Sequence, residues 1–225
     1  MPKSLRVDVV QGEGDFFGRY TPTAFHPTDN CIVASGIGVE KLTVIRCDSV
    51  EYKHFGDVAL PLCDDICFTN SGNFFVVVGS REISFWKWQG PDWIGCVRRV
   101  ANAPFQFETY CDFYTLPVDQ DKVWILGTDQ WVLWSAVSGK PLDSAVIAPK
   151  EQIVWAGHNN AGEPTVVTID EYLVNHPQVT LSVICLSSQK IVGSIPFNQW
   201  VHVVVNLDGS YAVSQGNQGN RMSNL

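Results

Sequence analysis

Apolar runs joined by short polar turns recur along this chain. In each copy an apolar run, a polar turn and a second apolar run follow one another; the copies are Thr23–Val33, Ile66–Val76, a longer one over Asp112–Leu126, and Val203–Val213. The turns contain the steps Asp29-Asn30, Ser71-Gly72 and Asp208-Gly209, which tolerate positive φ and reverse the chain tightly. The pattern therefore predicts β-hairpins.

A further strand of alternating pattern accompanies the hairpins. Its four occurrences are Leu42–Ile45, Ile83–Trp86, Trp131–Trp134 and Leu181–Ile184, and their last residues follow one another at intervals of about 40 to 50 residues. Turns at Ser138–Leu142 and Ser187–Lys190 then lead into a fourth strand, Asp143–Val146 and Ile191–Ile195 respectively. Four strands repeated with this period are typical of the blades of a β-propeller.

Two stretches resemble the WD-repeat family. Trp131–Leu142 is similar to that family's third strand, tryptophan position and following turn, and Phe68–Trp86 is similar to its first three strands. The resemblance implies an all-β propeller of four-stranded antiparallel blades that binds other proteins. The family's Gly-His step is absent from the repeat starts, and Trp86-Lys87 and Trp134-Ser135 replace its Trp-Asp step. The family's hydrogen-bond tetrad is therefore not carried over, and packing is expected to hold the blades together.

The repeat divides a single domain, residues 1–225, into about five blades. We expect them near residues 22–57, 58–101, 105–148, 150–196, and 197–225 together with 4–11. The fifth blade has no fourth strand of its own, and Leu5–Val10 is the strand expected to complete it. Two arrangements stay open: a ring closed by both chain ends in one blade, and an incomplete part of a larger propeller.

Composition and charge narrow the classes of function. Hydrophobic residues make up 45% and charged residues 17%, which is typical of a globular chain. The formal charge of −8 argues against binding to nucleic acid by this chain alone. No apolar stretch reaches the ~20 residues of a membrane span, and Met1–Leu5 lacks the apolar run of a signal peptide. We therefore expect an intracellular protein, cytoplasmic or nuclear.

Motifs for catalysis and metal binding do not stand out. GxSxG, HExxH and P-loop patterns are absent. The seven Cys form no CxxC pair, and Cys67 and Cys185, inside apolar runs, are expected to be buried thiols. The five His show no metal spacing, and His26 and His158, both in polar turns, are expected at the surface. We expect no catalytic residue, no metal site and no cofactor.

Carboxylate pairs leave one enzymatic alternative open. Asp64-Asp65 precedes a predicted first strand, and Asp170-Glu171 follows a predicted second strand. Glycosidases use two carboxylates across one cleft. Solvated loop acids are the commoner explanation, so a glycan-binding or hydrolytic propeller is an alternative and not the leading hypothesis.

Aromatic and charged residues near the loops are the predicted partner contacts: Arg81, Trp88, Tyr110, Asp129, Trp200 and His202. Arg81 and Asp129 fall between second and third strands, whereas Tyr110, Trp200 and His202 lie near the starts of first strands. These two sets of loops share one face of a WD-repeat propeller. Trp88 flanks a Gln-Gly-Pro-Asp turn. Aromatic residues and Arg are frequent anchors of protein interfaces.

The leading hypothesis for function is a noncatalytic scaffold, a subunit of a multiprotein complex that binds other protein subunits. A second hypothesis comes from Phe68–Val100, which is similar to part of the WD-repeat subunit of a tRNA 7-methylguanosine methyltransferase. That similarity implies a noncatalytic subunit of an RNA-modifying complex. The third is the glycan-binding or hydrolytic propeller.

Overall fold

The structure is a computed structural model. It describes residues 23–35, 42–46, 52–55, 63–79, 82–90, 94–101, 114–127, 130–146, 151–170, 179–197, 201–205 and 211–215. All regular structure in these ranges is β-strand.

The strands form one sheet after another along the chain. The first sheet (sheet I) contains β1(Thr23–Phe25), β2(Cys31–Ser35), β3(Leu42–Arg46) and β4(Tyr52–Phe55). Sheet II contains β5(Cys63–Phe68), β6(Phe74–Gly79), β7(Glu82–Trp88) and β8(Ile94–Ala101). Sheet III contains β9(Tyr114–Val118), β10(Lys122–Leu126), β11(Gln130–Ser135) and β12(Lys140–Val146). Sheet IV contains β13(Glu151–His158), β14(Pro164–Asp170), β15(Val179–Cys185) and β16(Lys190–Phe197). The pair β17(Val201–Val205) and β18(Tyr211–Gln215) follows.

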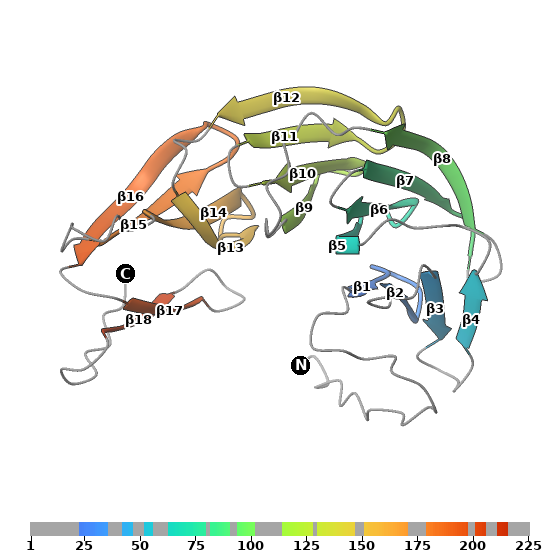
Figure 1. Ribbon diagram of the computed structural model, residues 1–225, viewed down its shortest axis with the longest axis horizontal. Coiled ribbons are helices and arrows are strands. Elements are labelled where there is room, and N and C mark those ends of the chain that lie inside the picture. The colour runs from blue at the N-terminus through green and yellow to red at the C-terminus, as the bar shows by residue number, and fades with distance from the viewer. Residues whose placement is uncertain are drawn as a thin grey trace.

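Each four-stranded sheet is an antiparallel meander in which every strand pairs with the next along the chain. The sheets succeed one another around an arc, with the first strands on its inner side and the fourth strands on its outer rim (Figure 1). This is the arrangement of propeller blades. The prediction of an all-β propeller with four-stranded antiparallel blades is confirmed.

Three of the sheets also share an irregularity at the same position. A shift of register interrupts the pairing of third and fourth strands between Phe85 and Trp86, between Leu133 and Trp134, and between Val183 and Ile184. A β-bulge increases the local twist of its strand. The bulge therefore gives three sheets the same twisted outer hairpin, and equivalent residues of the blades can be compared directly.

In the described part of the chain, side chains from neighbouring sheets interlock into three apolar cores. Alternation along a strand sends successive residues to opposite faces, and the central sheets use both faces. In β6, Phe75 and Val77 pack toward sheet I, whereas Phe74, Val76 and Val78 pack toward sheet III. All six residues of β6 are consequently buried. The near-continuous apolar runs in the sequence reflect this burial on both faces.

Sheets III and IV share the third core in the same way. Trp124 and Leu126 of β10 and Trp131 of β11 pack with Val166 and Ile184 of sheet IV. The neighbouring residues of these strands, such as Ile125, point the other way into the core shared with sheet II. At ~25 cal/mol per Å² of apolar surface, such interlocked cores are the main source of stability in the described part of the chain.

The fifth unit is described only through β17 and β18, which form a two-stranded sheet. The strand expected at residues 4–11 lies outside the described residues. The arc of sheets is consistent with an incomplete propeller (Figure 1). The division of residues 1–225 into a single domain with these blade limits stays a prediction.

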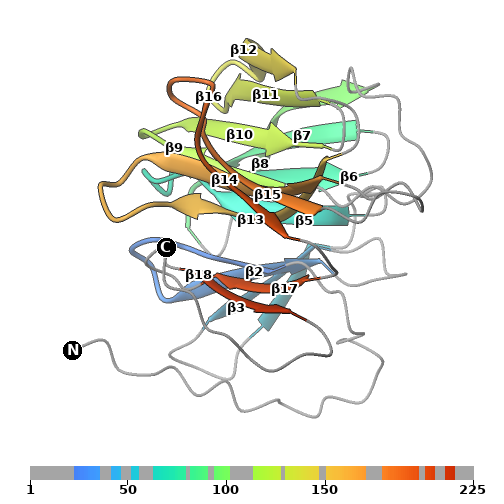
Figure 2. The same ribbon diagram turned by 90° about the vertical axis from the view of Figure 1, so that its left-hand side faces the viewer.

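Strand ends lie on two faces of the arc, as the view turned by 90° shows (Figure 2). We call one of them the turn face. It carries the turns between first and second strands, named turn I (residues 26–30), turn II (69–73), turn III (119–121) and turn IV (159–163), and the turns between third and fourth strands. Because the strands alternate in direction, the other two sets of connections belong to the opposite face, which we call the loop face.

Asp65 corrects one expectation from the sequence. The Asp64-Asp65 pair lies within β5 and not in a loop before it. The Asp65 carboxylate accepts hydrogen bonds from the backbone N–H of Thr115 at 2.6 Å and from its hydroxyl at 2.9 Å. Asp65 is therefore a partly buried link between the first strands of sheets II and III. A local sequence pattern could not reveal it, because Thr115 belongs to the next blade.

Candidate functional site

Turns I and II are joined by a histidine. The Nδ1 atom of His26 accepts hydrogen bonds from the backbone N–H groups of Thr28 at 3.2 Å and Asp29 at 2.8 Å. The proton of the neutral ring must then be on Nε2, which lies 3.0 Å from the carbonyl oxygen of Gly72 and donates to it. The His26 side chain is only 4% exposed. The prediction that His26 is a surface residue was wrong, because the ring is enclosed by the neighbouring sheet.

Aromatic rings surround this histidine. The ring centroid of His26 lies 4.8 Å from that of Phe68 and 5.2 Å from that of Trp88. The indole N–H of Trp88 donates to a carboxylate oxygen of Asp29 at 3.0 Å. Trp88 is 8% exposed, so its ring contributes mainly to the contact between sheets I and II.

Turns II and III are joined in a different chemical way. The backbone N–H of Ser71 donates to the carbonyl oxygen of Gln120 at 2.9 Å. The hydroxyls of Thr69 and Ser71 both donate to the same carboxylate oxygen of Asp121, the first at 3.3 Å. Side-chain and backbone hydrogen bonds therefore fix turn II against turn III.

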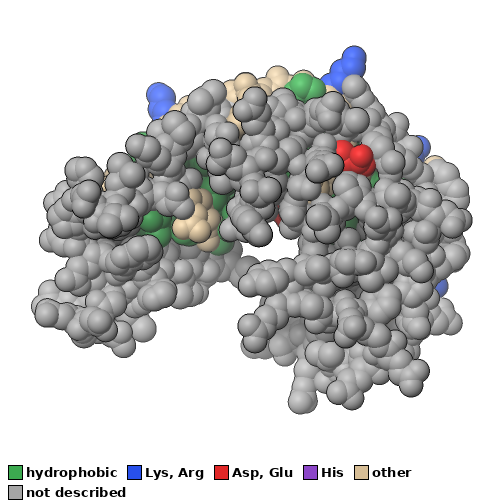
Figure 3. All heavy atoms as spheres, in the orientation of Figure 1, with side chains coloured by type: hydrophobic (Ala, Val, Ile, Leu, Met, Phe, Trp, Pro, Cys, Tyr) green, Lys and Arg blue, Asp and Glu red, His purple; other side chains and the backbone are tan. Residues whose placement is uncertain are grey.

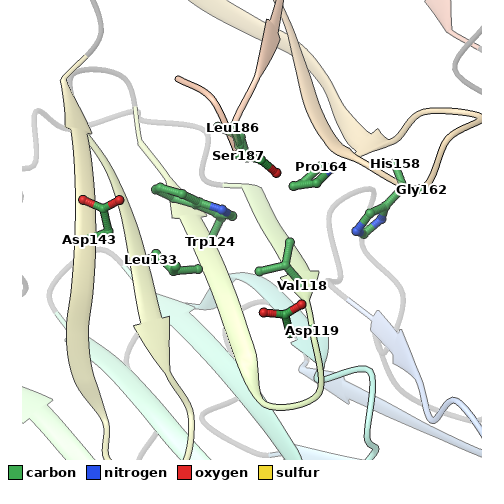
Figure 4. Close-up of a pocket in the computed structure, with 10 residues that line it drawn as sticks. All are labelled: Val118, Asp119, Trp124, Leu133, Asp143, His158, Gly162, Pro164, Leu186 and Ser187. Carbon is green, nitrogen blue, oxygen red and sulfur yellow. The ribbon is translucent and has the colours of Figure 1, made fainter. Parts of the chain in front are cut away.

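Turns III and IV differ from the other two pairs. Among the described residues, no hydrogen bond joins turn III to turn IV. Instead, a pocket of about 230 Å³ lies between sheets III and IV (Figure 4). Residues of both sheets line it: Val118, Asp119, Trp124, Leu133, Asp143, His158, Gly162, Pro164, Leu186 and Ser187. It is the candidate binding site of the described part of the chain.

Buried apolar side chains and exposed polar ones make up the pocket wall. Trp124 and Leu186 are 4% and 1% exposed and belong to the core between sheets III and IV. Asp119 and Asp143 are exposed. One Asp119 oxygen accepts from Lys122 Nζ at 2.8 Å. Asp143 accepts from neutral donors, the Ser144 N–H at 2.8 Å and the Gln189 amide at 3.1 Å, so no described cation balances its charge.

His158 contributes a neutral ring to the pocket. It is the last residue of β13 and is half-buried. Burial lowers the pKa of its imidazole below the usual 6.5, because a low-dielectric environment disfavours the charged ring. A surface position was predicted for His158, since it stands beside Asn159 and Asn160 in the sequence. The local pattern does not reveal that His158 lines a pocket together with residues of sheet III.

The predicted partner contacts are only partly described. Arg81, Tyr110, Asp129 and Trp200 lie outside the described residues, and His202 lies in β17 without a described side chain. Trp88 ends β7 at the turn face, whereas Glu82, next to Arg81, begins it at the loop face. The ends of this seven-residue strand are roughly 20 Å apart. Trp88 is therefore not on the face expected for the other five, and its role in partner binding stays a prediction.

The tryptophans expected at the WD position do not form the family's tetrad. The indole N–H of Trp86 donates to the Ser84 hydroxyl on its own strand at 2.9 Å. The indole N–H of Trp134 is buried without a hydrogen-bond partner. Packing holds these rings in place, as the sequence predicted: Trp86 stacks on Phe75 with centroids 5.7 Å apart.

Within the described ranges, no three His, Cys, Asp or Glu side chains lie together in a way that could hold a metal ion. No helix in this part of the chain has the length and apolar character needed to cross a membrane.

Comparison with known proteins supports the fold. No family model and no curated protein matches the chain. Among solved structures, the Dos1 propeller is similar, with a TM-score of 0.57 and 12% sequence identity. The similarity covers 87% of this chain and 55% of the Dos1 propeller chain. At this identity the likeness shows a β-propeller fold alone. The chain spans about half the length of that structure.

Proposed function

We propose that this chain is a divergent WD-repeat propeller that acts as a noncatalytic scaffold in a multiprotein complex of the cytoplasm or nucleus. Its partners are other protein subunits, which bind loops at the loop face. The predicted contacts are Arg81, Tyr110, Asp129, Trp200 and His202, with Trp88 as a sixth contact at the other end of sheet II.

One observation carries this proposal: sheets I, II and III are joined to one another both by apolar cores and by hydrogen bonds between their turns. His26 with Gly72 joins sheets I and II, and Ser71 with Gln120 joins sheets II and III. A framework fixed in this way holds its loops at defined distances from one another. Preorganised loops lose little conformational entropy when a partner binds, which favours a binding surface.

The lengths of the connections between strands favour the loop face as the binding surface. Turns I to IV at the turn face are short, and turns I, II and III are engaged in contacts between sheets. The loop face has the longer connections, residues 102–113 between β8 and β9 and residues 171–178 between β14 and β15. Long connections on a rigid scaffold are where binding residues concentrate, and Tyr110 lies in one of them.

The test is quantitative capture of partners by the tagged full chain from its native extract. The chain with Arg81→Ala and Tyr110→Ala is compared with a matched control, Val137→Ala and Leu142→Ala. Val137 and Leu142 are 55% and 52% exposed and lie away from the loop face. Thermal unfolding of both variants checks that the fold is intact.

We expect to capture a stoichiometric protein partner. The control variant should retain it, whereas the loop-face variant should capture at least about tenfold less of it, as expected when interface anchors are removed. Equal capture of the partner by both variants would reject the loop face as the binding surface. Recovery of RNA with the partner would favour the RNA-modifying complex, and selective retention of glycans without a protein partner would favour the glycan-binding alternative.

A further inference from the structure

β16 is the outermost strand of sheet IV and has one free edge. The strand order of this sheet is β13-β14-β15-β16, and among the described residues no strand pairs with the far edge of β16. The strand is eight residues long and lies on the outer rim of the arc (Figure 1). A free edge presents N–H and C=O groups that can pair with another strand.

Charged residues guard the other outer strands but not β16. Each of the other three fourth strands contains two Lys, Arg, His or Asp residues: Lys53 and His54 in β4, Arg98 and Arg99 in β8, and Lys140 and Asp143 in β12. The described Lys and Arg side chains that are visible in Figure 3 lie toward this outer rim. In β16 only the first residue, Lys190, is charged, and residues 191–197 carry no charge. Because charge on an outer strand opposes edge-to-edge pairing, β16 is the fourth strand best suited to such pairing.

Two large aliphatic side chains are exposed at the start of this strand. Ile191 is 60% and Val192 is 63% exposed, more than any other large hydrophobic side chain in the described part of the chain. Val192 is the residue that the β-bulge leaves without a partner in β15. These side chains provide apolar surface beside the free edge, which a second strand would help to cover.

Pro196 indicates which backbone groups point to the free edge. Pro196 lies opposite Thr180 of β15, and Ser194 lies opposite Ser182. Proline has no N–H, so within a sheet it occupies positions of an edge strand at which the N–H side faces away from the neighbouring strand. Alternate residues share this orientation. The N–H and C=O of Ser194 therefore point to the free edge.

We propose that β16 pairs antiparallel with β16 of a second copy of this chain, about a two-fold axis at Ser194. Residues that lie opposite each other in an antiparallel pair can exchange two N–H···O=C hydrogen bonds. Ser194 of both copies can do so, because a two-fold axis brings the same residue of each copy together. The pairing also brings Ile191 and Val192 of each copy toward the end of the other β16, near Pro196.

Charge favours a second copy as the occupant of this edge. The formal charge of −8 keeps copies apart in general, so they can meet only where like charges do not face each other. Residues 191–197 provide such a segment, whereas the same pairing through β8 would bring Arg98 and Arg99 of the two copies together. A strand of a different protein would in addition need a matching edge of its own.

This dimer goes beyond the proposed scaffold function, because its contacts lie along the outer rim and not in the connections at the loop face. It leaves the loop face of each copy free for a partner. The purified chain shows the dimer without any partner, so failure of the dimer and failure of the scaffold function are distinguishable.

Sedimentation velocity of the purified full chain at increasing concentrations tests the dimer. We expect a reversible equilibrium between monomer and dimer. Ser194→Lys sets two like charges against each other across the axis and should raise the dimer dissociation constant at least about tenfold, and Ser194→Asp should do the same. Ser144→Lys is the matched control and should not change the constant. Ser144 is exposed and stands two residues after the unpaired bulge residue of β12, as Ser194 does in β16.

Mixing the two Ser194 variants tests the position of the axis. Opposite charges then face each other, so the mixture should form a heterodimer that native mass spectrometry detects, since cross-strand pairs of opposite charge are favourable. Absence of the heterodimer would overturn the pairing about Ser194.

Hydrogen exchange provides a test at single residues. The Ser194 N–H should become protected as the concentration of the wild type rises, whereas the N–H of Ile195, which faces β15, should be protected throughout. Exchange of Ser194 that does not depend on concentration would contradict the proposal. A wild type that stays monomeric at every concentration, or a Ser194→Lys variant that dimerises as the wild type does, would overturn it. A monomeric wild type that captures a different protein, which Ser194→Lys loses and Ser144→Lys retains, would also overturn it and assign the edge to that protein.

Discussion

The imidazole of His26 and the carbonyl of Gly72 lie 3.0 Å apart and join the first two sheets of the arc. This contact depends on the absence of a side chain at residue 72. A Cβ added to Gly72 would lie 2.7 Å from both Cε1 and Nε2 of His26. Gly72 also has a φ of 73°, which residues with a Cβ rarely adopt.

Gly72→Ala is therefore expected to destabilise the protein more than Gly162→Ala. Both variants strain a left-handed residue at a cost of about 1 kcal/mol, but nothing lies within 4 Å of a Cβ at Gly162. Displacing His26 adds the loss of a buried hydrogen bond, roughly 1–2 kcal/mol. Urea unfolding of the two variants measures this difference. Equal free energies of unfolding would show that His26 moves aside without cost.

Asp65 makes stability depend on pH in a defined direction. Burial raises the pKa of its carboxyl above 3.8, and the hydrogen bonds from Thr115 and Ile66 oppose this effect only in part. The folded state then holds the proton more tightly than the unfolded state. The resulting stabilisation is complete below pH 3.8 and is lost as the pH rises through the raised pKa.

The measurement is the free energy of unfolding of the wild type and of Asp65→Asn across this pH range. The free energy of unfolding of the wild type, minus that of Asp65→Asn, should decrease as the pH rises. The comparison removes the contributions of the other carboxylates. A difference that is flat, or that grows with pH, would contradict the assigned direction.

His158 has the opposite dependence. Burial lowers its pKa below 6.5, so the unfolded state takes up the proton first. The associated stability is present above pH 6.5 and is lost as the pH falls through the lowered value. Thermal unfolding of the wild type and His158→Gln between about pH 5 and 8 should show that acid destabilises the wild type more. A His26→Gln variant is not a suitable control, since that ring holds two sheets together.

Cys67 should be chemically inert in the folded protein. Burial raises the pKa of its thiol to about 12, and the thiolate is the form that reacts with alkylating agents. We expect iodoacetamide at pH 8 to leave Cys67 unmodified in the folded chain and to label it fully in urea, as read by peptide mass spectrometry. Labelling of the folded chain at the rate of a free thiol would show that β5 opens locally.

Sequence alone predicted the strands, their order and their grouping. Alternation within β7 and β11, and the regular return of third strands ending in Ile45, Trp86, Trp134 and Ile184, indicated four-stranded antiparallel blades. The Ser71-Gly72 step predicted a tight turn, and the φ of 73° at Gly72 agrees with it. These features are local, because hydrogen-bonded meander strands are neighbours along the chain.

Contacts between blades were decided by the tertiary structure. His26, Asp65 and His158 were expected in solvent. His26 and Asp65 instead make hydrogen bonds to a neighbouring sheet, and His158 lines the pocket between sheets III and IV. The pocket likewise depends on turn III facing turn IV. Such pairs are about one blade period apart in sequence, and alternation within a strand does not specify which residue of the next blade lies opposite. Only the packing of one sheet on the next fixes that pairing, and with it the burial and the chemistry of the turn face.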